Sequence, residues 1–166
     1  LRKPAFKVIN STTKLLPAWS ACLKTYNQPE TLIPRDVSTR WNSTNDMVDY
    51  CVGHSKPLKA FLAEEDNDLE AFNLTAQEWR CTKQLHSPLK QATLFFSRDE
   101  TPNLASVIPA MDRLDRELAT ACVDEGLEPA IRAAANLAKK MLNRYYSLTD
   151  ASETYRIAMG AFIAHL

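Results

Sequence analysis

A cation and a flat aromatic ring stand side by side in the stretch RDVSTRWNST, residues 35 to 44. Arg40 and Trp41 lie among polar residues, just before the first convincing helical pattern. A guanidinium beside an indole suits a nucleic acid, because the cation contacts phosphate and the ring stacks on an unpaired base. A tryptophan at a helix start also packs against the next turn as a hydrophobic staple. The residues alone leave both interpretations of Trp41 open.

Other groups with catalytic potential are scattered along the chain. The sequence contains no glycine-rich phosphate loop, no GxSxG and no HExxH. His54, His86 and His165 each lack a neighbouring nucleophile and a third orienting group. Asp36 and Asp46 flank the tryptophan, but their spacing gives no reason for the two carboxylates to converge on a metal. We therefore assign no catalytic residue, no metal site and no cofactor to this chain.

The four cysteines, Cys22, Cys51, Cys81 and Cys122, are far apart and form no CxxC pair. A disulfide framework is typical of smaller secreted chains, and zinc sites need tighter ligand spacing. Cys51 and His54 form a CxxH that no second pair of ligands accompanies. We expect buried free thiols in a reducing compartment.

The composition is that of an ordinary globular domain. Of 166 residues, 45% are hydrophobic and 24% charged, and 20 basic residues balance 20 acidic ones. A net charge of zero argues against a free-standing nucleic-acid binder that relies on bulk electrostatics, although local basic patches stay possible. No apolar run approaches membrane-spanning length, so we expect no membrane partner. The chain begins with Leu1 rather than Met, and we expect a fragment of a larger protein.

The elements that must position Arg40 and Trp41 are helical. Pro17 divides the first 26 residues into two short helices or one kinked helix, and a loop follows. The next helix begins at Asn42 or Ser43, where Ser43 and Asp46 form a weak capping box, and it bends near His54 because of Pro57. The acidic run EEDND then forms a solvated turn.

Three further helices are expected in the second half. Thr75 and Glu78 form a full capping box for a helix that Pro88 kinks. Thr101-Pro102 opens a helix that bends at Pro109 and ends at Gly126 in a left-handed cap. Pro129 opens a helix with a narrow seam for close helix contact, comprising Ile131, Ala134, Ala138, Met141, Leu142 and Tyr145. Residues 153–165 fit a helix or a strand, with a short strand possible near residues 155–160. The prediction is an all-α array of five to six helices, several of them proline-kinked.

Four strings recur in the order seen in one family. DVSTRWNSTNDMV, LTAQEW, LKQATLFFSRDETPNLASVIPAMDRL and NRYYSLTDASETYRIAM together resemble hAT-family (hobo/Ac/Tam3) transposases over residues 32–160. The resemblance implies a helical insertion within an RNase H-like catalytic core. On this basis residues 1–34 form an N-terminal helical segment and loop, and residues 35–166 form the insertion domain.

The resemblance also implies roles for the opening motif. Trp41 would stack near the flipped base or hairpin at a transposon end, and Arg40 would contact the backbone. Arg35 and Asn42 complete the expected DNA-binding set. The three catalytic acids of the family, the divalent metal (Mg) that its core uses, its zinc finger and its dimerisation segment all lie outside this chain, which is therefore not expected to be an enzyme by itself.

Our leading hypothesis is a DNA-end-binding helical region of a hAT-like transposase, or of a decayed or domesticated relative, acting in the nucleus. Its partners would be transposon ends, with self-association or the missing catalytic core as further possibilities. The alternative is a structural helical module for protein interaction that does not bind nucleic acid. An exposed Trp41 beside Arg35, Arg40 and Lys56 favours DNA binding, whereas a buried Trp41 favours the alternative.

Overall fold

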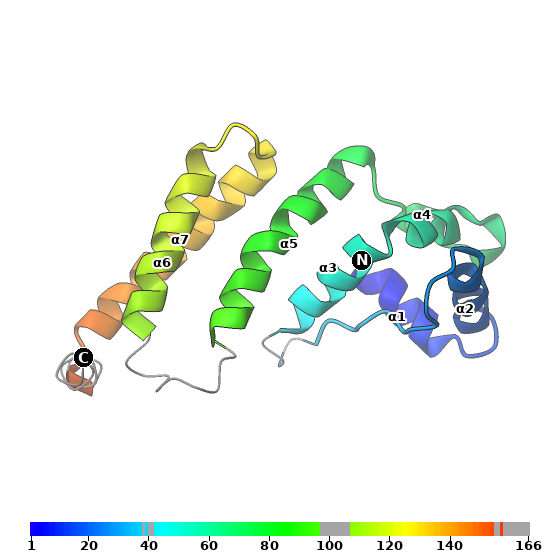
Figure 1. Ribbon diagram of the computed structural model, residues 1–166, viewed down its shortest axis with the longest axis horizontal. Helices are drawn as coiled ribbons and strands as arrows, with labels where there is room; N and C mark the ends of the chain where they lie inside the picture. The colour runs from blue at the N-terminus through cyan, green and yellow to red at the C-terminus, as the bar shows by residue number, and fades with distance from the viewer. Residues whose placement is uncertain (38, 40–41, 97–106, 155–156, 158–166) are drawn as a thin grey trace. The chain divides into compact units, whose positions relative to one another are not determined.

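The structure is a computed structural model, and it describes the chain except for residues 38, 40–41, 97–106, 155–156 and 158–166. Side chains are also not described for residues 87–96 and Asp150. Within these limits the chain is all-helical and contains no strand, so the predicted fold class is confirmed (Figure 1). The chain divides into two compact units, Leu1–His86 and Ser87–Leu166.

The first unit begins with two short helices, as Pro17 indicated. Helix α1 spans Arg2–Asn10 and α2 spans Leu15–Thr25. Pro17 lies in the first turn of α2, where a residue without an N–H group removes no helical hydrogen bond. The Ser11 hydroxyl accepts the Leu15 N–H at 3.2 Å, so a side chain satisfies one of the free donors at the start of α2.

The core of the first unit is built around Trp19. Its ring is fully buried and packs edge-on against Phe61, with ring centroids 5.2 Å apart. The indole Nε1–H donates to the Thr31 carbonyl at 3.1 Å, so the polar end of the ring is also satisfied. The other buried apolar residues of this core are Ala5, Val8, Leu15, Leu23, Ile33, Met47, Val48, Cys51, Leu58, Leu62, Leu69 and Trp79.

The predicted bend near His54 is present as a break between two helices. Helix α3 spans Ser43–Gly53 and α4 spans Ser55–Ala63, and His54 is the terminal residue shared by both. Pro57 falls in the first turn of α4, which explains why the helix restarts just before it. The His54 ring stacks on Tyr50 with centroids 3.9 Å apart, and its Nδ1 lies 2.8 Å from the Tyr50 carbonyl oxygen.

The acidic run EEDND forms the solvated turn that we expected. It contributes the 3-10 helix η1, Glu65–Asn67, and a second one, η2, spans Glu70–Phe72. Asn67 is the exception within the run, because it is buried and its side chain donates to the Phe61 carbonyl at 2.8 Å.

The capping box that begins α5 is confirmed. The Thr75 hydroxyl accepts the Glu78 N–H at 3.2 Å, and the Glu78 carboxylate accepts the Thr75 N–H at 2.7 Å. Helix α5 spans Ala76–Phe96 and runs through Pro88 as one helix. A capping box of this kind fixes where the chain turns into the helix, since it satisfies two backbone donors at once.

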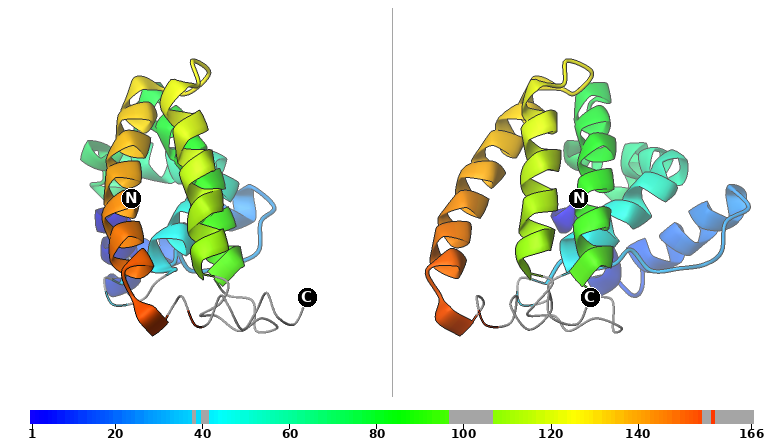
Figure 2. Two further views of the ribbon diagram at one scale, coloured as in Figure 1. Left: turned by 90° about the vertical axis from the view of Figure 1, so that its left-hand side faces the viewer. Right: turned by 60° about the vertical axis from the view of Figure 1, so that its left-hand side comes forward.

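The second unit contains an antiparallel hairpin of α6, Val107–Val123, and α7, Pro129–Asp150 (Figure 2). Pro129 occupies the first position of α7, as predicted. Pro109 lies near the start of the described part of α6, and whether it bends the helix depends on residues 101–106, which lie outside the described residues. The predicted start at Thr101-Pro102 lies outside the described residues.

The predicted left-handed cap at Gly126 is wrong. Gly126 does not have a positive φ, and its N–H donates to the Asp124 side chain at 2.9 Å. This local hydrogen bond turns the chain between α6 and α7 without the left-handed conformation that glycine would otherwise provide.

The hairpin interface differs from the predicted seam of α7. Ala110, Met111 and Ala135 are buried in the second unit, whereas Met141 and Tyr145 of the seam are 62% and 58% exposed. Periodicity placed these residues on one stripe, but the stripe that contacts α6 lies further round the helix.

The structure describes only some of residues 153–165, for which a helix and a strand were the two expected alternatives. Glu153, Thr154 and Ile157 are helical, and the rest of residues 155–160 lies outside the described part. Among the helices that the structure describes, none has the length and apolar character needed to cross a membrane.

Candidate functional site

The stretch RDVSTRWNST connects the loop after α2 to the start of α3. Arg40 and Trp41, the two residues with the sharpest predicted roles, lie outside the described residues, as does Ser38. Arg35, Asp36, Val37, Thr39 and Asn42–Thr44 are described. The geometry of the site is therefore that of the two flanks of the motif.

Hydrogen bonds join these flanks. Asp36 Oδ1 accepts the Ser43 hydroxyl at 2.9 Å and the Thr44 hydroxyl at 2.8 Å. The Ser43 Oγ also accepts the Val37 N–H at 2.8 Å and lies 2.8 Å from the Val37 carbonyl oxygen. We call this group, Asp36, Val37, Ser43 and Thr44, the clamp. It closes the chain on itself across the motif.

The clamp corrects the expected start of α3. The helix begins at Ser43, as predicted, but its N-cap is Asn42, and no capping hydrogen bond from that side chain is present. Ser43 is the first helical residue, and its hydroxyl turns toward Asp36 instead of forming a capping box with Asp46. The carboxylate of Asp36 thus places negative charge at the N-terminal end of α3, where the helix dipole favours it.

An ion pair extends the clamp to α1. The Arg2 guanidinium contacts Asp36 Oδ2, and the Asp36 side chain is only 8% exposed. Hydrogen bonds from Thr44 and Ser43 lower the pKa of the Asp36 carboxyl, and the positive charge of Arg2 lowers it further against the opposing effect of burial. Asp36 is therefore a stable anion that holds α1, the motif and α3 together.

A second cation lies beside the clamp on the surface. The Arg35 guanidinium lies 5.4 Å from the centre of the Phe6 ring, and both side chains are exposed. Cation–ring contacts of this kind orient an arginine while leaving its N–H donors free to bind. Phe6 lies one turn after Arg2 on α1, so α1 supports both cations.

Asn42, one of the residues predicted to bind DNA, lies at the start of α3. It is partly exposed, and its backbone carbonyl accepts the Asp46 N–H at 2.9 Å, the first hydrogen bond of α3. The structure therefore brings Arg35 and Asn42 to the two flanks of one closed loop. Sequence reasoning missed the contribution of Arg2 and Phe6, because α1 is distant in sequence and no motif linked it to residue 36.

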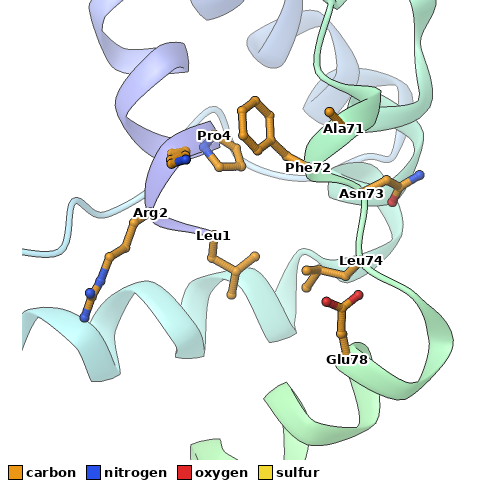
Figure 3. A pocket seen from close by; sticks show the side chains of 9 residues that line it. Leu1, Arg2, Pro4, Ala71, Phe72, Asn73, Leu74 and Glu78 are labelled. Atoms are coloured by element: carbon orange, nitrogen blue, oxygen red, sulfur yellow. The ribbon is translucent and has the colours of Figure 1, made fainter.

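A pocket of about 350 Å³ opens on the other side of Arg2 (Figure 3). It lies between the start of α1 and the chain that leads into α5. Its lining comprises Leu1, Arg2, Lys3, Pro4, Ala71, Phe72, Asn73, Leu74 and Glu78. The Glu78 carboxylate is already engaged by the capping box, so the pocket offers no acid free for chemistry.

Groups capable of catalysis or metal binding do not converge in the described part of the chain. No set of three or more histidine, cysteine, aspartate or glutamate side chains there is placed to hold a metal ion. His86 Nε2 lies 2.6 Å from an Asp49 carboxylate oxygen, and no third such group joins this pair in the described residues. Cys51 is buried among apolar residues, which raises the pKa of its thiol to about 12 and suppresses the nucleophilic thiolate.

Comparison with known proteins identifies the region that carries the clamp. The family model of the ZBED1 RNase-like helical domain matches residues 3–88. The match includes α1 and α2, which precede the stretch where the hAT-like resemblance began, and it contains the whole RDVSTRWNST motif. No curated protein and no solved structure matches the chain. The match supports the hAT-like interpretation at the level of a transposase-derived helical domain, and the chain belongs to the ZBED1 RNase-like helical domain family.

Proposed function

We propose that the first unit is a DNA-end-binding helical region of a hAT-like transposase or of a decayed or domesticated relative, catalytically incomplete by itself. The clamp is the observation that supports this most directly. Asp36 and Ser43 fasten the two flanks of the RDVSTRWNST motif with side-chain hydrogen bonds of 2.8 to 2.9 Å. Binding residues are commonly carried on loops that a rigid scaffold positions, and α1 and α3 supply such a scaffold here.

The charges near the clamp favour an anionic partner. Arg35 is exposed beside the loop, and Lys3 and Arg2 are exposed at the start of α1. Arg2 is partly neutralised by Asp36, so Arg35 and Arg40 are the cations assigned to phosphate. With a formal net charge of zero for the chain, such binding depends on local rather than bulk electrostatics.

Each motif residue has a distinct role in this proposal. Trp41 stacks on an unpaired base at a transposon end, Arg40 and Arg35 contact phosphate, and Asn42 offers an amide beside them. The catalytic acids and the divalent metal are supplied by a core outside these residues. The setting is the nucleus.

The test compares binding to a DNA hairpin with binding to the corresponding duplex at low salt. Trp41→Ala is expected to weaken hairpin binding by ~1–3 kcal/mol and to leave duplex binding nearly unchanged, because stacking needs an unpaired base. Arg40→Ala and Arg35→Ala are expected to weaken both and to reduce the salt slope by about one ion each.

Lys24→Ala is the charge-matched control. Lys24 is exposed and pairs with Glu30 at 3.0 Å, so the variant removes one positive charge away from the motif. If Trp41→Ala weakens hairpin and duplex binding equally and also lowers the melting temperature, Trp41 packs in the core instead of stacking on a base. That result favours the protein-interaction alternative.

A further inference from the structure

Helix α7 carries a row of large apolar side chains on its exposed side. Leu137, Met141, Tyr145 and Leu148 are 67%, 62%, 58% and 64% exposed. Their spacing of four, four and three residues places them on one helix face, which we call the outer stripe. Ala135, on the opposite face, is buried. Four large apolar side chains in contiguous exposure mark an interaction surface more often than a solvated one.

Small residues extend and border the outer stripe. Ala130 and Ala134 continue it toward the start of α7, and both are exposed. Ala133 and Ala138 lie at its two edges and are exposed as well. Alanines beside larger apolar side chains let a second helix approach closely while the larger side chains pack into its grooves. The shape of this face suits a helix.

Before its last residue, Asp150, the charges of α7 all have the same sign. From Pro129 to Thr149 the sequence contains four cations, Arg132, Lys139, Lys140 and Arg144, and no acid. Lys139 points toward α6 and pairs with Asp115 at 2.6 Å. Lys140 and Arg144 are exposed along one edge of the outer stripe, and neither forms an ion pair with another described residue.

We propose that the outer stripe binds an amphipathic helix of a partner protein, with acidic residues along the edge that meets Lys140 and Arg144. A second copy of this chain fits less well, because it would bring the same cations to the same seam, and no acid stands between Pro129 and Thr149 to pair with them. Two cations on one edge are few for an anionic lipid surface or for the phosphate backbone of DNA, both of which call for a broader basic face. This inference concerns the second unit and is independent of the DNA-end proposal.

The experiment measures binding of the full 166-residue chain to a designed helical peptide of about three heptads with a leucine seam and glutamates along one edge. The matched peptide carries lysines in place of the glutamates. We expect about tenfold weaker binding of the lysine peptide, the order that two exposed ion pairs give. Exchanging both cations, Lys140→Glu with Arg144→Glu, is expected to reverse that preference.

Variants of the outer stripe separate burial from charge. Leu137→Gln with Met141→Gln keeps good helix formers at exposed positions, so α7 is expected to stay folded while the affinity falls about tenfold or more. Val123→Gln is the matched control, since Val123 is 74% exposed at the end of α6 and lies off the stripe. Circular dichroism verifies the helix content of every variant.

Three results would overturn the proposal. The first is peptide binding that is absent, or that the stripe variants leave unchanged. The second is concentration-dependent self-association of the chain that these variants abolish, which assigns the stripe to a second copy. The third is binding to anionic vesicles or duplex DNA, without peptide binding, that depends on Lys140 and Arg144.

Discussion

The two units of this chain bury their apolar residues in different ways. In the first, short helices and the intervening loops enclose a core that includes Trp19, Phe61 and Trp79. In the second, two long helices meet along one face, and the buried residues that the structure describes there, such as Ala135 and Met111, are small or flexible. Two helices side by side can cover only one face of each other, so a hairpin exposes whatever apolar residues its sequence places on the outside. Similar apolar periodicity therefore produces a closed core in the first unit and an exposed apolar surface in the second.

Two leucines provide the strongest test of that difference. Leu62→Ala, in the closed core at 0% exposure, is expected to lower the free energy of unfolding by ~2–5 kcal/mol. Leu137→Ala, at 67% exposure on the outer stripe, is expected to change it by no more than about 0.5 kcal/mol. Urea unfolding followed by circular dichroism measures both. An equal decrease in the free energy of unfolding for the two variants would show that the two units do not differ in how they bury apolar residues.

The thiols sharpen the comparison chemically. Burial raises the pKa of Cys51 from 9.0 to about 12, so its thiolate population near pH 8 is roughly a thousandfold below that of an ordinary thiol. Alkylation of Cys51 is therefore expected to be slower in the folded protein than in the urea-unfolded protein by a similar factor, and slower than that of Cys122, which is only partly buried. Mass spectrometry of partially labelled protein measures this, with urea-unfolded protein as the control in which both react. Equal labelling of the two thiols in the folded state contradicts a closed core around Cys51.

The boundary of α5 tests a smaller, local contribution. Thr75→Ala removes the hydroxyl of the capping box and is expected to cost ~1 kcal/mol of stability. Thr82→Ala is the control, because the Thr82 hydroxyl only donates to the Glu78 carbonyl within the same helix, at 2.8 Å. We expect its effect to stay within about 0.5 kcal/mol. A control variant as destabilising as Thr75→Ala would show that the cap adds nothing specific.

The clamp predicts a pH effect that is smaller again, because water screens the exposed partner Arg2. The pKa of Asp36 is lower in the folded chain than in the unfolded one. Its contribution is therefore present above the unfolded pKa, near 4, and is lost as the pH falls through the folded value. Asp36→Asn is expected to reduce the loss of stability in that acid range, measured by thermal unfolding as a function of pH. If Asp36→Asn loses as much stability at acid pH as the unsubstituted chain, Asp36 has the same pKa in the folded and unfolded chains.

Local signals in the sequence predicted the fold well. A helix start depends on contacts within one turn, as with Thr75 and Glu78 for α5 and Pro129 for α7. Its position can therefore be predicted without the rest of the chain. The prediction of a left-handed cap at Gly126 failed for a related reason. The side chain of Asp124 accepts the Gly126 N–H and forms the turn without a left-handed residue. Glycine permits a left-handed conformation but does not require it.

The candidate site was predictable only in part, since its geometry depends on contacts distant in sequence. Ser43 was expected to bond within α3, but Asp36, seven residues earlier, takes its hydroxyl. Arg2 lies 34 residues before Asp36, and no spacing rule connects them. The apolar period of α7 likewise identified a stripe containing Met141 without showing which face of the helix α6 would cover. Periodicity reports that a side chain is apolar, and only tertiary structure decides what covers it.

The clamp has a consequence for which sequence changes this chain can accept. The residues that close the loop, Asp36 and Ser43, are separate from those proposed to recognise DNA between them. Closing a longer flexible loop costs only about 0.6 kcal/mol for each doubling of its length. Substitutions and insertions between Val37 and Ser43 can therefore accumulate while α1 and α3 keep their positions. Under the proposed function, new DNA-binding residues can therefore arise in this loop without refolding the domain.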